Sequence, residues 1–486
     1  MNVGDDRETH DEALCGNDGK LASAEAKNKP TRYWGFSPPI VYLADMAHHP
    51  SPYRLLPVLA LSLLLAGMLT TQHSCAQKRS NVQVLGADRL QGSVVGDMDI
   101  RELIGNVRMR QDNVLIYCDR ATQNITRNSV ELVGNVKILQ DTLELRTDRG
   151  YYDGDTRTAS SRKGVYLNDG HVTLTARLGT YNTGSKIADF LDDVTIEDTA
   201  ATITARRMRY TRDSSLIVAS DSVRIQFKDE NVHIVADSVR HYPDAQRSFF
   251  YNDPVLWQID TVHAELNSLG EYDSLEIDTL NIAADFMQAL RDSSNIFLTE
   301  GNVRIVREDL AARSAIAHFL RDDSLIILMG EPILWYGENQ ITGDSIAALL
   351  VNNELRALDV IGHAFSISRS KPSEQDTLYP PDRFDQTSGK KIFMHFEESS
   401  PQRIRIEQTA TSLYFLYDEG ALNGVRRESS DLIIIDFADG QVSEIRSIKG
   451  VEGAYYPEKY VTGKESSYNL DGFEWRDDRP LMIRSR

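Results

Sequence analysis

Carboxylates are the most numerous side chains of this chain that could perform catalysis. The chain has 72 Asp and Glu residues, and stretches such as "DGDTRTAS" and "NDG" place Asp where turns favour it. An enzyme that cleaves polysaccharides would need paired carboxylates, or a set of Lys and Arg, in one exposed cleft. No acidic pair recurs in a way that marks such a site, so these residues predict turns rather than catalysis.

Motifs of the common catalytic and metal sites are absent from the sequence. It contains no G-x-S-x-G, H-E-x-x-H or C-x-x-C motif, and its 11 His are scattered. We therefore predict that the protein is not an enzyme and that it uses no cofactor and no metal. The cysteines are Cys15, Cys75 and Cys118. If export removes the first two, the remaining thiol cannot form an intramolecular disulfide.

Two groups of side chains could bind a polar ligand, and each also has a structural interpretation. The arginines of segment 206–209 could meet phosphates, but a run of this kind among acids usually forms a solvated strand face. Tyr152, Tyr181 and Tyr210 stand 29 residues apart. They could contact sugars, although a ladder of rings on one sheet face explains them more simply. The net charge of −19 argues against nucleic acid and gives no reason to expect an anionic membrane surface.

The elements that would position any site repeat at a fixed interval. The valines at Val107, Val136, Val165, Val194 and Val223 are each 29 residues apart, with no insertion or deletion. Two residues after each valine stands another large apolar residue, and this alternation is typical of a half-buried strand. The "GN" before three such strands indicates a bend, because Gly accepts a positive φ and Asn suits the same position.

A second and a third strand keep the same register, and turn formers such as "QDN" and "RDSS" separate the strands. One column of the second strand is small, at Cys118, Thr147, Ala176 and Ala205, and it could widen a groove or relieve crowding at a corner. One such unit cannot bury its own apolar face, so neighbouring units must stack around a continuous interior. We predict an all-β fold, a repetitive open β-jelly-roll built as a solenoid-like stack of short strands with a repeat of about 29 residues. The pattern leaves open whether the strands are parallel or antiparallel.

The N-terminal part predicts export. Residues 1–54 are polar and irregular, and we interpret them as a disordered leader or as the result of a mis-called start, with Met46 as the alternative start. Residues 55–76 have the features of a signal peptide: "LLPVLALSLLLAGML" is uncharged, and "SCAQ" offers a cut before Gln77. The apolar run is short for a membrane span, although an uncleaved anchor is the alternative. We expect a periplasmic protein, with membrane anchoring as a further possibility.

The repeats continue in looser form beyond the strictly periodic region. "TEGNVRIV", "MGEPILWY" and "VIGHAFSI" are similar to the first strand. The repeat region therefore extends over 77–368. Residues 369–390 are polar and Pro-rich and predict a linker or long loop. Strand patterns return in 391–486, which we interpret as a degenerate C-terminal β region that serves as a cap or docking end.

These motifs resemble those of a known family. "GNV" followed by an apolar strand, and then "CDRATQ", "TDRGYY", "ARLGTY", "ARRMRY" or "ADSVRHY", is similar to the OstA-like, or LptA-like, proteins of lipopolysaccharide transport and outer membrane biogenesis. The resemblance implies a β-jelly-roll whose apolar interior carries the acyl chains of lipopolysaccharide. It also implies docking of open sheet edges onto other jelly-roll components or onto a second copy. The chain departs from the family's translocon member because no long series of barrel strands follows the repeats.

The lipid-binding groove that the resemblance implies would be lined by the repeated apolar residues. They are Val107, Met109, Ile116, Val136, Ile138, Leu145, Val165, Leu167, Leu174, Val194, Ile196, Ile203, Val223 and Ile225. The alternative is a plain core without space for lipid. A polysaccharide-processing enzyme on a β-solenoid and a surface adhesin are the alternative functions. Because the edges would dock partners, Pro at Val84 or Ile435 is expected to impair assembly more than folding.

Overall fold

The computed structural model describes most of the chain after the predicted signal peptide. The described residues are 80–228, 231–266, 272–292, 294–308, 310–351, 354–372, 380–397, 400–438 and 441–483. They belong to one compact unit, Ala76–Arg486. The predicted leader 1–54 and signal 55–76 lie outside the described residues.

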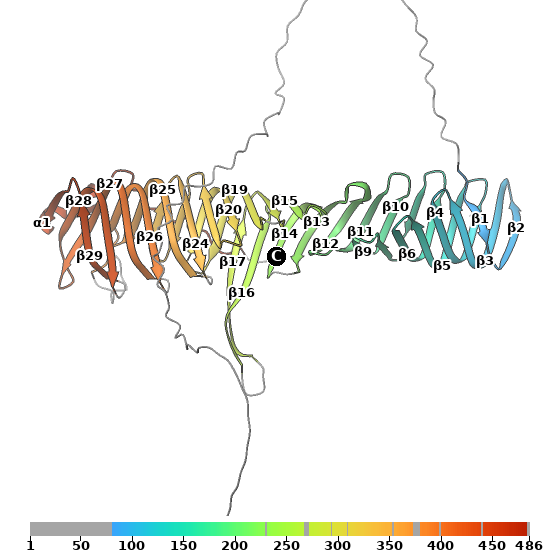
Figure 1. Cartoon of the computed structure of the whole chain (residues 1–486), viewed down its shortest axis with the longest axis horizontal. Coiled ribbons are helices and arrows are strands. Elements are labelled where there is room, and N and C mark those ends of the chain that lie inside the picture. The colour runs from blue at the N-terminus through green and yellow to red at the C-terminus, as the bar shows by residue number, and fades with distance from the viewer. Residues whose placement is uncertain are drawn as a thin grey trace, which may run out of the picture. The chain divides into compact units, whose positions relative to one another are not determined.

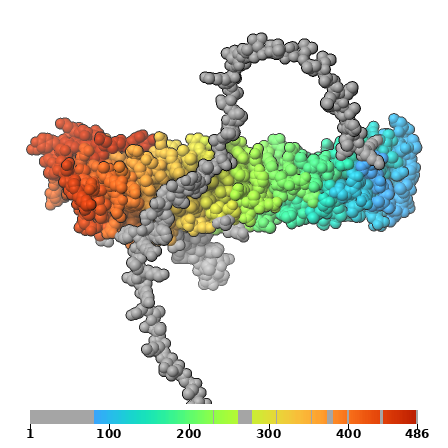
Figure 2. Space-filling view, turned by 45° about the horizontal axis from the view of Figure 1, so that its top comes forward, coloured from blue at the N-terminus to red at the C-terminus, as the bar shows by residue number. Residues whose placement is uncertain are grey.

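Strands make up almost all of this unit, and they follow one another along it in chain order (Figure 1). The surface colours in Figure 2 keep the same order from blue to red. The strands are β1 (Gln83–Gly86), β2 (Arg89–Val95), β3 (Met98–Gln111), β4 (Val114–Asn124), β5 (Ser129–Gln140), β6 (Leu143–Asp153), β7 (Thr158–Ser161), β8 (Val165–Asn168), β9 (Thr173–Ala176), β10 (Leu178–Asn182), β11 (Ile187–Glu197), β12 (Ala201–Thr211), β13 (Leu216–Phe227), β14 (Val232–Tyr242), β15 (Arg247–Tyr251), β16 (Val255–Leu266), β17 (Tyr272–Ala283), β18 (Phe286–Leu290), β19 (Ile296–Arg307), β20 (Leu310–Leu320), β21 (Leu325–Met329), β22 (Ile333–Tyr336), β23 (Asn339–Thr342), β24 (Ser345–Val351), β25 (Glu354–Arg369), β26 (Phe384–Glu397), β27 (Ser400–Asp418), β28 (Ala421–Ala438), β29 (Gln441–Ile448) and β30 (Glu452–Pro457).

Helices are few and short in the described residues. They are η1 (Arg212–Ser214), α1 (Glu458–Val461) and η2 (Glu465–Tyr468). No helix in this part of the chain has the length and apolar character needed to cross a membrane. The all-β fold predicted from the alternating pattern is confirmed.

Hairpin connections make the sheet antiparallel throughout the described strands. Strand β5, for example, pairs with β4 on one side and with β6 on the other. Such a ladder needs only the short turns that the sequence supplies between strands. The question that the sequence left open is therefore answered in favour of an antiparallel, jelly-roll-like arrangement.

An irregularity near the middle of each long strand divides it into two parts. In β5 and β6 the register shifts between Val133 and Val136, and equivalent shifts recur in β3, β11 and β13. We call the parts arm 1 and arm 2. In these two strands arm 1 holds residues 129–133 and 149–153, and arm 2 holds residues 136–140 and 143–147.

Strand pairing continues separately in each arm along the molecule. Arm 1 of β6 pairs with β7, whereas arm 2 of β6 pairs with β8. The next strands also pair within one arm each, because β7 pairs with β10 and β8 pairs with β9. Side chains of both arms, including Leu132 and Tyr152 from arm 1 and Ile138 and Leu145 from arm 2, belong to one buried core cluster. The arms therefore face each other across a shared interior.

The "GN" of the repeat forms the corner between the arms. Gly134 and Asn135 have φ of 78° and 44°, and the Asn135 side chain donates a hydrogen bond to Asp119 of the preceding strand at 2.9 Å. Gly105, Gly301 and their asparagines repeat this geometry with Asp88 and Asp285. Two consecutive left-handed residues make a bulge that bends the strand, so the expected bend is confirmed at these positions.

The C-terminal part contains the strands expected from the sequence and a different final segment. Strand β26 begins at Phe384, so the stretch 369–390 that was interpreted as a linker includes the end of β25 and the start of β26. After Pro457 the described residues contain no further strand. A second core cluster forms there on another face of the sheet, and it includes Phe365, Leu413, Val461 and Leu470.

Candidate functional site

All fourteen predicted groove residues lie on arm 2. Nine of them stand directly opposite one another across successive strands, from Met109 through Ile116 and Ile138 to Ile225. The same row continues beyond the strict repeat through Ile234, Leu256, Ile282, Ile305, Ala312, Leu334 and Ile341. The repeat spacing therefore builds an unbroken apolar row across the sheet.

Each predicted groove residue is buried. Their exposed fractions range from 0% to 5%, and all fourteen belong to one core cluster. Arm 1 supplies the opposite wall with Leu132, Phe190, Met208 and Phe250, which are equally buried. Sequence reasoning did not assign this wall to the groove, although arm 1 positions such as Val130, Ala159 and Ala188 also stand 29 residues apart.

The small column lies beside the corner. Cys118, Ala176 and Ala205 pair with Val107, Val165 and Val194, the first residues after the bulge. Burial raises the pKa of the Cys118 thiol to about 11, and its Sγ donates to the carbonyl of Arg120 at 3.2 Å. The thiol is thus protonated at neutral pH and is not a nucleophile. A small side chain at this position leaves room for the sharp bend.

The tyrosine column lies inside the molecule rather than at an exposed rim. Tyr152, Tyr181 and Tyr210 are at most 2% exposed. The Tyr152 hydroxyl donates to Gln111 Oε1 at 2.6 Å, and the Tyr181 hydroxyl donates to Gln140 Oε1 at 2.6 Å. Burial raises the pKa of Tyr181 to about 12, so this hydroxyl remains a donor at neutral pH.

Two more pairs continue this row. The Tyr210 hydroxyl donates to Asp169 Oδ2, and His241 Nε2 lies 2.6 Å from Asp198 Oδ2. Burial acts to raise the pKa of Asp198, but the hydrogen bonds and charge of His241 outweigh it, and the pKa lies below its ordinary value. In all four pairs the first residue comes from arm 1 and the second from arm 2.

The partners of the tyrosines were not identified from the sequence, although a signal exists. Gln111, Gln140, Asp169 and Asp198 are 29 residues apart, and each follows a predicted groove residue by two positions. An alternating strand places them on the inner face. Because these side chains are polar, the sequence alone suggests that they face solvent. They are buried because side chains of arm 1 lie opposite them and form hydrogen bonds with them.

The arginines of segment 206–209 lie on the outer face and are paired with carboxylates. Arg206 contacts Asp192, Arg207 contacts Asp221 and Arg209 contacts Asp189. The arginine side chains are 59–69% exposed, as expected for a solvated strand face. No group of His, Cys, Asp and Glu in the described residues could hold a metal ion.

The match to a family model agrees with the motif-based resemblance. Residues 79–237 match the family model described as OstA-like protein. Among solved structures, the crystal structure of LptH, the LptA-homologous periplasmic component of the conserved lipopolysaccharide transport device from Pseudomonas aeruginosa, matches at 15% sequence identity with a TM-score of 0.23. That match covers 30% of this chain and 95% of the LptH chain. The search of curated proteins found no match.

The chain therefore contains an OstA-like region, and the expected resemblance is confirmed over residues 79–237. This region includes the part of the molecule in which the 29-residue spacing is strict. Three of the four inter-arm pairs lie entirely within it, and His241 of the fourth pair lies just beyond its end.

Proposed function

We propose that this chain is a non-enzymatic periplasmic protein of lipopolysaccharide transport or assembly. Its interior between the arms carries acyl chains towards the outer membrane, and the signal at 55–76, cut before Gln77, exports it. The observation that carries the proposal is the unbroken apolar row of arm 2, which lies within and beyond a region that matches the OstA-like family.

An interior of this kind suits an amphiphile with several acyl chains. Each methylene group removed from water is worth about 0.8 kcal/mol, so one chain of ordinary length contributes several kcal/mol. The row Met109 to Ile225 offers apolar contacts at every strand, and a cargo could move along it without passing a charged side chain of the row. Sugars and phosphates would remain outside the arms.

The ends of the sheet supply docking surfaces for other jelly-roll components or for a second copy. Strand β2 pairs only with β3, and Leu90, Val94 and Val95 on it are 53–72% exposed. At the other end β29 and β30 pair with β28 alone. Such edges accept another strand. Ile435, however, is paired on both sides and buried, so it is not the edge position that the sequence suggested, whereas Val84 on β1 pairs only with β3.

A crosslinking experiment tests the proposed path. A photoreactive diazirine amino acid is placed at Leu145, which faces the interior, or at the adjacent Arg146, whose side chain is 59% exposed. After incubation with purified lipopolysaccharide and illumination, we expect crosslinked lipid at Leu145 and little at Arg146. Equal crosslinking at both positions, or none at Leu145, contradicts the proposal.

The alternative functions give other outcomes. Mass analysis of lipid co-purified without detergent should find lipopolysaccharide-derived lipid bound to the protein. Turnover of an oligosaccharide would instead favour the polysaccharide-processing enzyme, and a protein that carries no lipid and turns over no sugar would favour the adhesin.

A further inference from the structure

The interior between the arms is closed as well as apolar. The core residues of both arms are almost fully buried, and within one repeat the pocket lined by Val136, Ile138 and Leu145 measures about 10 Å³. This volume is about that of one water site. An acyl chain therefore cannot enter between the arms unless the arms separate.

Separation of the arms leaves the strand ladder intact. Neighbouring strands are joined by backbone hydrogen bonds within arm 1 and within arm 2. Between the arms the backbone is continuous at the corner, where the bulges lie. On the opposite side, which we call the mouth, hairpin tips of arm 1 and arm 2 meet. The side chains that join the arms at the mouth are thus the contacts that an opening must break.

The inner contacts of the mouth are the four pairs described above. Tyr152–Gln111, Tyr181–Gln140, Tyr210–Asp169 and His241–Asp198 occur once in each successive repeat. Gln111 Nε2 also donates to the carbonyl of Gly154 at 2.8 Å, and Gln140 Nε2 donates to that of Thr183 at 2.9 Å. Each glutamine therefore holds both a side chain and the backbone of the facing tip.

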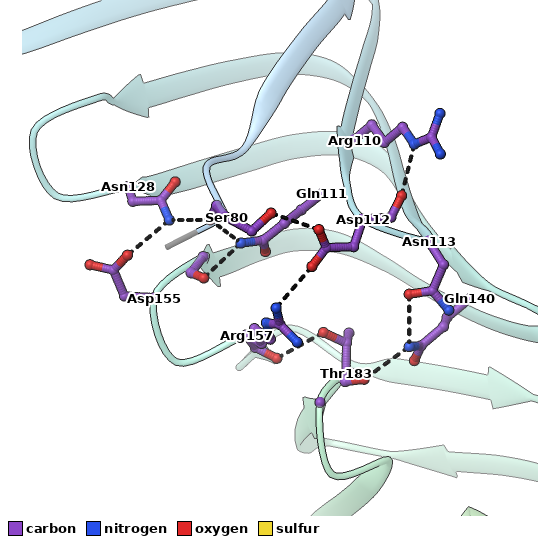
Figure 3. Close-up of polar contacts among 12 residues, drawn as sticks. Ser80, Arg110, Gln111, Asp112, Asn113, Asn128, Gln140, Asp155, Arg157 and Thr183 are labelled. Atoms are coloured by element: carbon purple, nitrogen blue, oxygen red, sulfur yellow. Dashed lines mark hydrogen bonds and ion pairs between the residues drawn. The ribbon is translucent and has the colours of Figure 1, made fainter. Parts of the chain in front are cut away.

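Two ion pairs between tips of the arms accompany the inner pairs, and we call them the outer ion pairs. Arg157 of arm 1 contacts Asp112 of arm 2 at 2.9 Å, with side chains 32% and 48% exposed. Arg212 contacts Asp141 at 3.5 Å and donates to Thr142 Oγ1 at 2.9 Å. Figure 3 shows Arg157 reaching Asp112 beside Gln111, and Gln140 reaching Thr183. Polar groups thus cross the mouth in two layers.

The alternative explanation is that the pairs only satisfy buried polar groups, which is their commonest role. Three features favour the hypothesis that these pairs open when the arms separate. The pairs join two arms whose strands do not pair with each other. They also recur with the repeat, and they lie in front of a tightly packed interior. A row of weak, reversible contacts permits opening one repeat at a time.

We propose that these four inter-arm pairs, together with the two outer ion pairs, form a latch that must open repeat by repeat to admit an acylated, anionic amphiphile between the arms. This inference rests on the proposed function for its ligand, whereas the opening itself is a property of the chain. Acyl chains that enter replace the contacts between the two apolar walls.

A locked mouth tests the latch. Thr142 and Ser185 are exposed residues on facing tips, and in a background without other cysteines, with Cys118→Ala, both are changed to Cys and joined by a cleavable bifunctional crosslinker. We expect the crosslinked protein to take up at least tenfold less lipopolysaccharide than the uncrosslinked protein, and cleavage of the linker to restore uptake. Undiminished uptake by the locked protein overturns the inference.

A weakened latch gives the opposite change and a readout without lipid. Tyr181→Phe keeps the ring and removes the hydroxyl, and Tyr151→Phe, on the outer face at 42% exposure, is the matched control. Distances between spin labels at 142 and 185 should include a larger population of long distances in Tyr181→Phe. The control Tyr151→Phe should give the same distances as the protein without either substitution. Lipid uptake should become about fivefold faster.

The two measurements separate the hypotheses. Widened distances without any lipid uptake would contradict the proposed function but support the opening. Unchanged distances in Tyr181→Phe, with unfolding stability equal to that of Tyr151→Phe, would overturn the latch even if lipid binds.

Discussion

Cys118 shows how a single residue adapts to the corner between the arms. Its side chain is 5% exposed and stands in the column that holds Ala176 and Ala205 in later repeats. Burial is the main reason why the pKa of its thiol rises from 9.0 to about 11. The folded state therefore holds the thiol proton more strongly than the unfolded state does.

Cys118→Ala should remove a dependence of stability on pH. An acid whose pKa is raised on folding contributes stability that is complete below its unfolded pKa, and this contribution is lost as the pH rises towards the folded pKa. Between pH 8 and pH 10.5 the wild type should lose about 2 kcal/mol more of its free energy of unfolding than Cys118→Ala. At pH 8 the two proteins should differ by less than about 1 kcal/mol, because the repeats already use Ala here.

Urea unfolding at the two pH values measures both quantities. The remaining thiols and tyrosines are common to both proteins, so their titration cancels in the difference. Parallel pH profiles for the two proteins would show that folding does not raise the pKa of the Cys118 thiol.

At the scale of the element, the bulge connects two motifs that are separate in the sequence. The "GN" of one strand and the Asp of the preceding strand form one unit, as in Gly134, Asn135 and Asp119. A Cβ on Gly134 would lie 2.4 Å from Asp119 Oδ2, and its φ is +78°. Both the approach of the carboxylate and the backbone conformation therefore require Gly at this position.

Gly134→Ala should destabilise the protein by roughly 2–3 kcal/mol, since it adds a collision to an unfavourable backbone conformation. Gly92→Ala is the matched control, because Gly92 lies on strand β2 with no atom within 4 Å of the added Cβ and no positive φ. Its free energy of unfolding should change by less than about 0.5 kcal/mol. Equal effects of the two substitutions in thermal or urea unfolding would exclude the bulge as the cause.

Period-two patterns were sufficient to predict the strands, but not the arms. Val107, Val136 and Val165 mark the strands because a half-buried strand alternates on every second residue. The sequence also marked the bends through "GN". It could not show that Tyr152 would meet Gln111, because that contact depends on how the two arms fold over each other. The interior wall of arm 2 was therefore predictable, and its closure by arm 1 was not.

At the scale of the whole described unit, the C-terminal segment covers a second apolar surface. Trp257, Val306, Ala311 and Trp335 are at most 9% exposed but lie outside the main core cluster. They alternate with inward residues such as Leu334, so they belong to the outer face of arm 2. Residues 469–483, which we call the strap, cross this face.

The strap is held through its backbone as well as through buried side chains such as Leu470. Gln340 Nε2 donates to the carbonyl of Glu474 at 2.6 Å, and Gln340 Oε1 accepts from the Arg476 N–H at 2.7 Å. The indole N–H groups of Trp335 and Trp257 donate to the carbonyls of Arg476 and Ile483. Contacts of this kind do not depend on the strap side chains. For this reason no periodicity marked the segment, and the sequence suggested only a degenerate end.

Gln340→Ala should loosen the strap. Gln340 is 1% exposed, and its loss leaves two backbone groups of the strap without a partner, which costs about 2 kcal/mol. Trypsin can cleave after Arg476 only when the strap leaves the sheet, so cleavage there should become at least tenfold faster. Gln288→Ala, on β18 and away from the strap, is the control and should cleave at the wild-type rate. Mass spectrometry of the released C-terminal peptides follows both variants.

If Gln340→Ala is cleaved no faster than Gln288→Ala, the glutamine does not hold the strap. The apolar contacts of Trp335 and Trp257 would then be sufficient to keep it on the sheet.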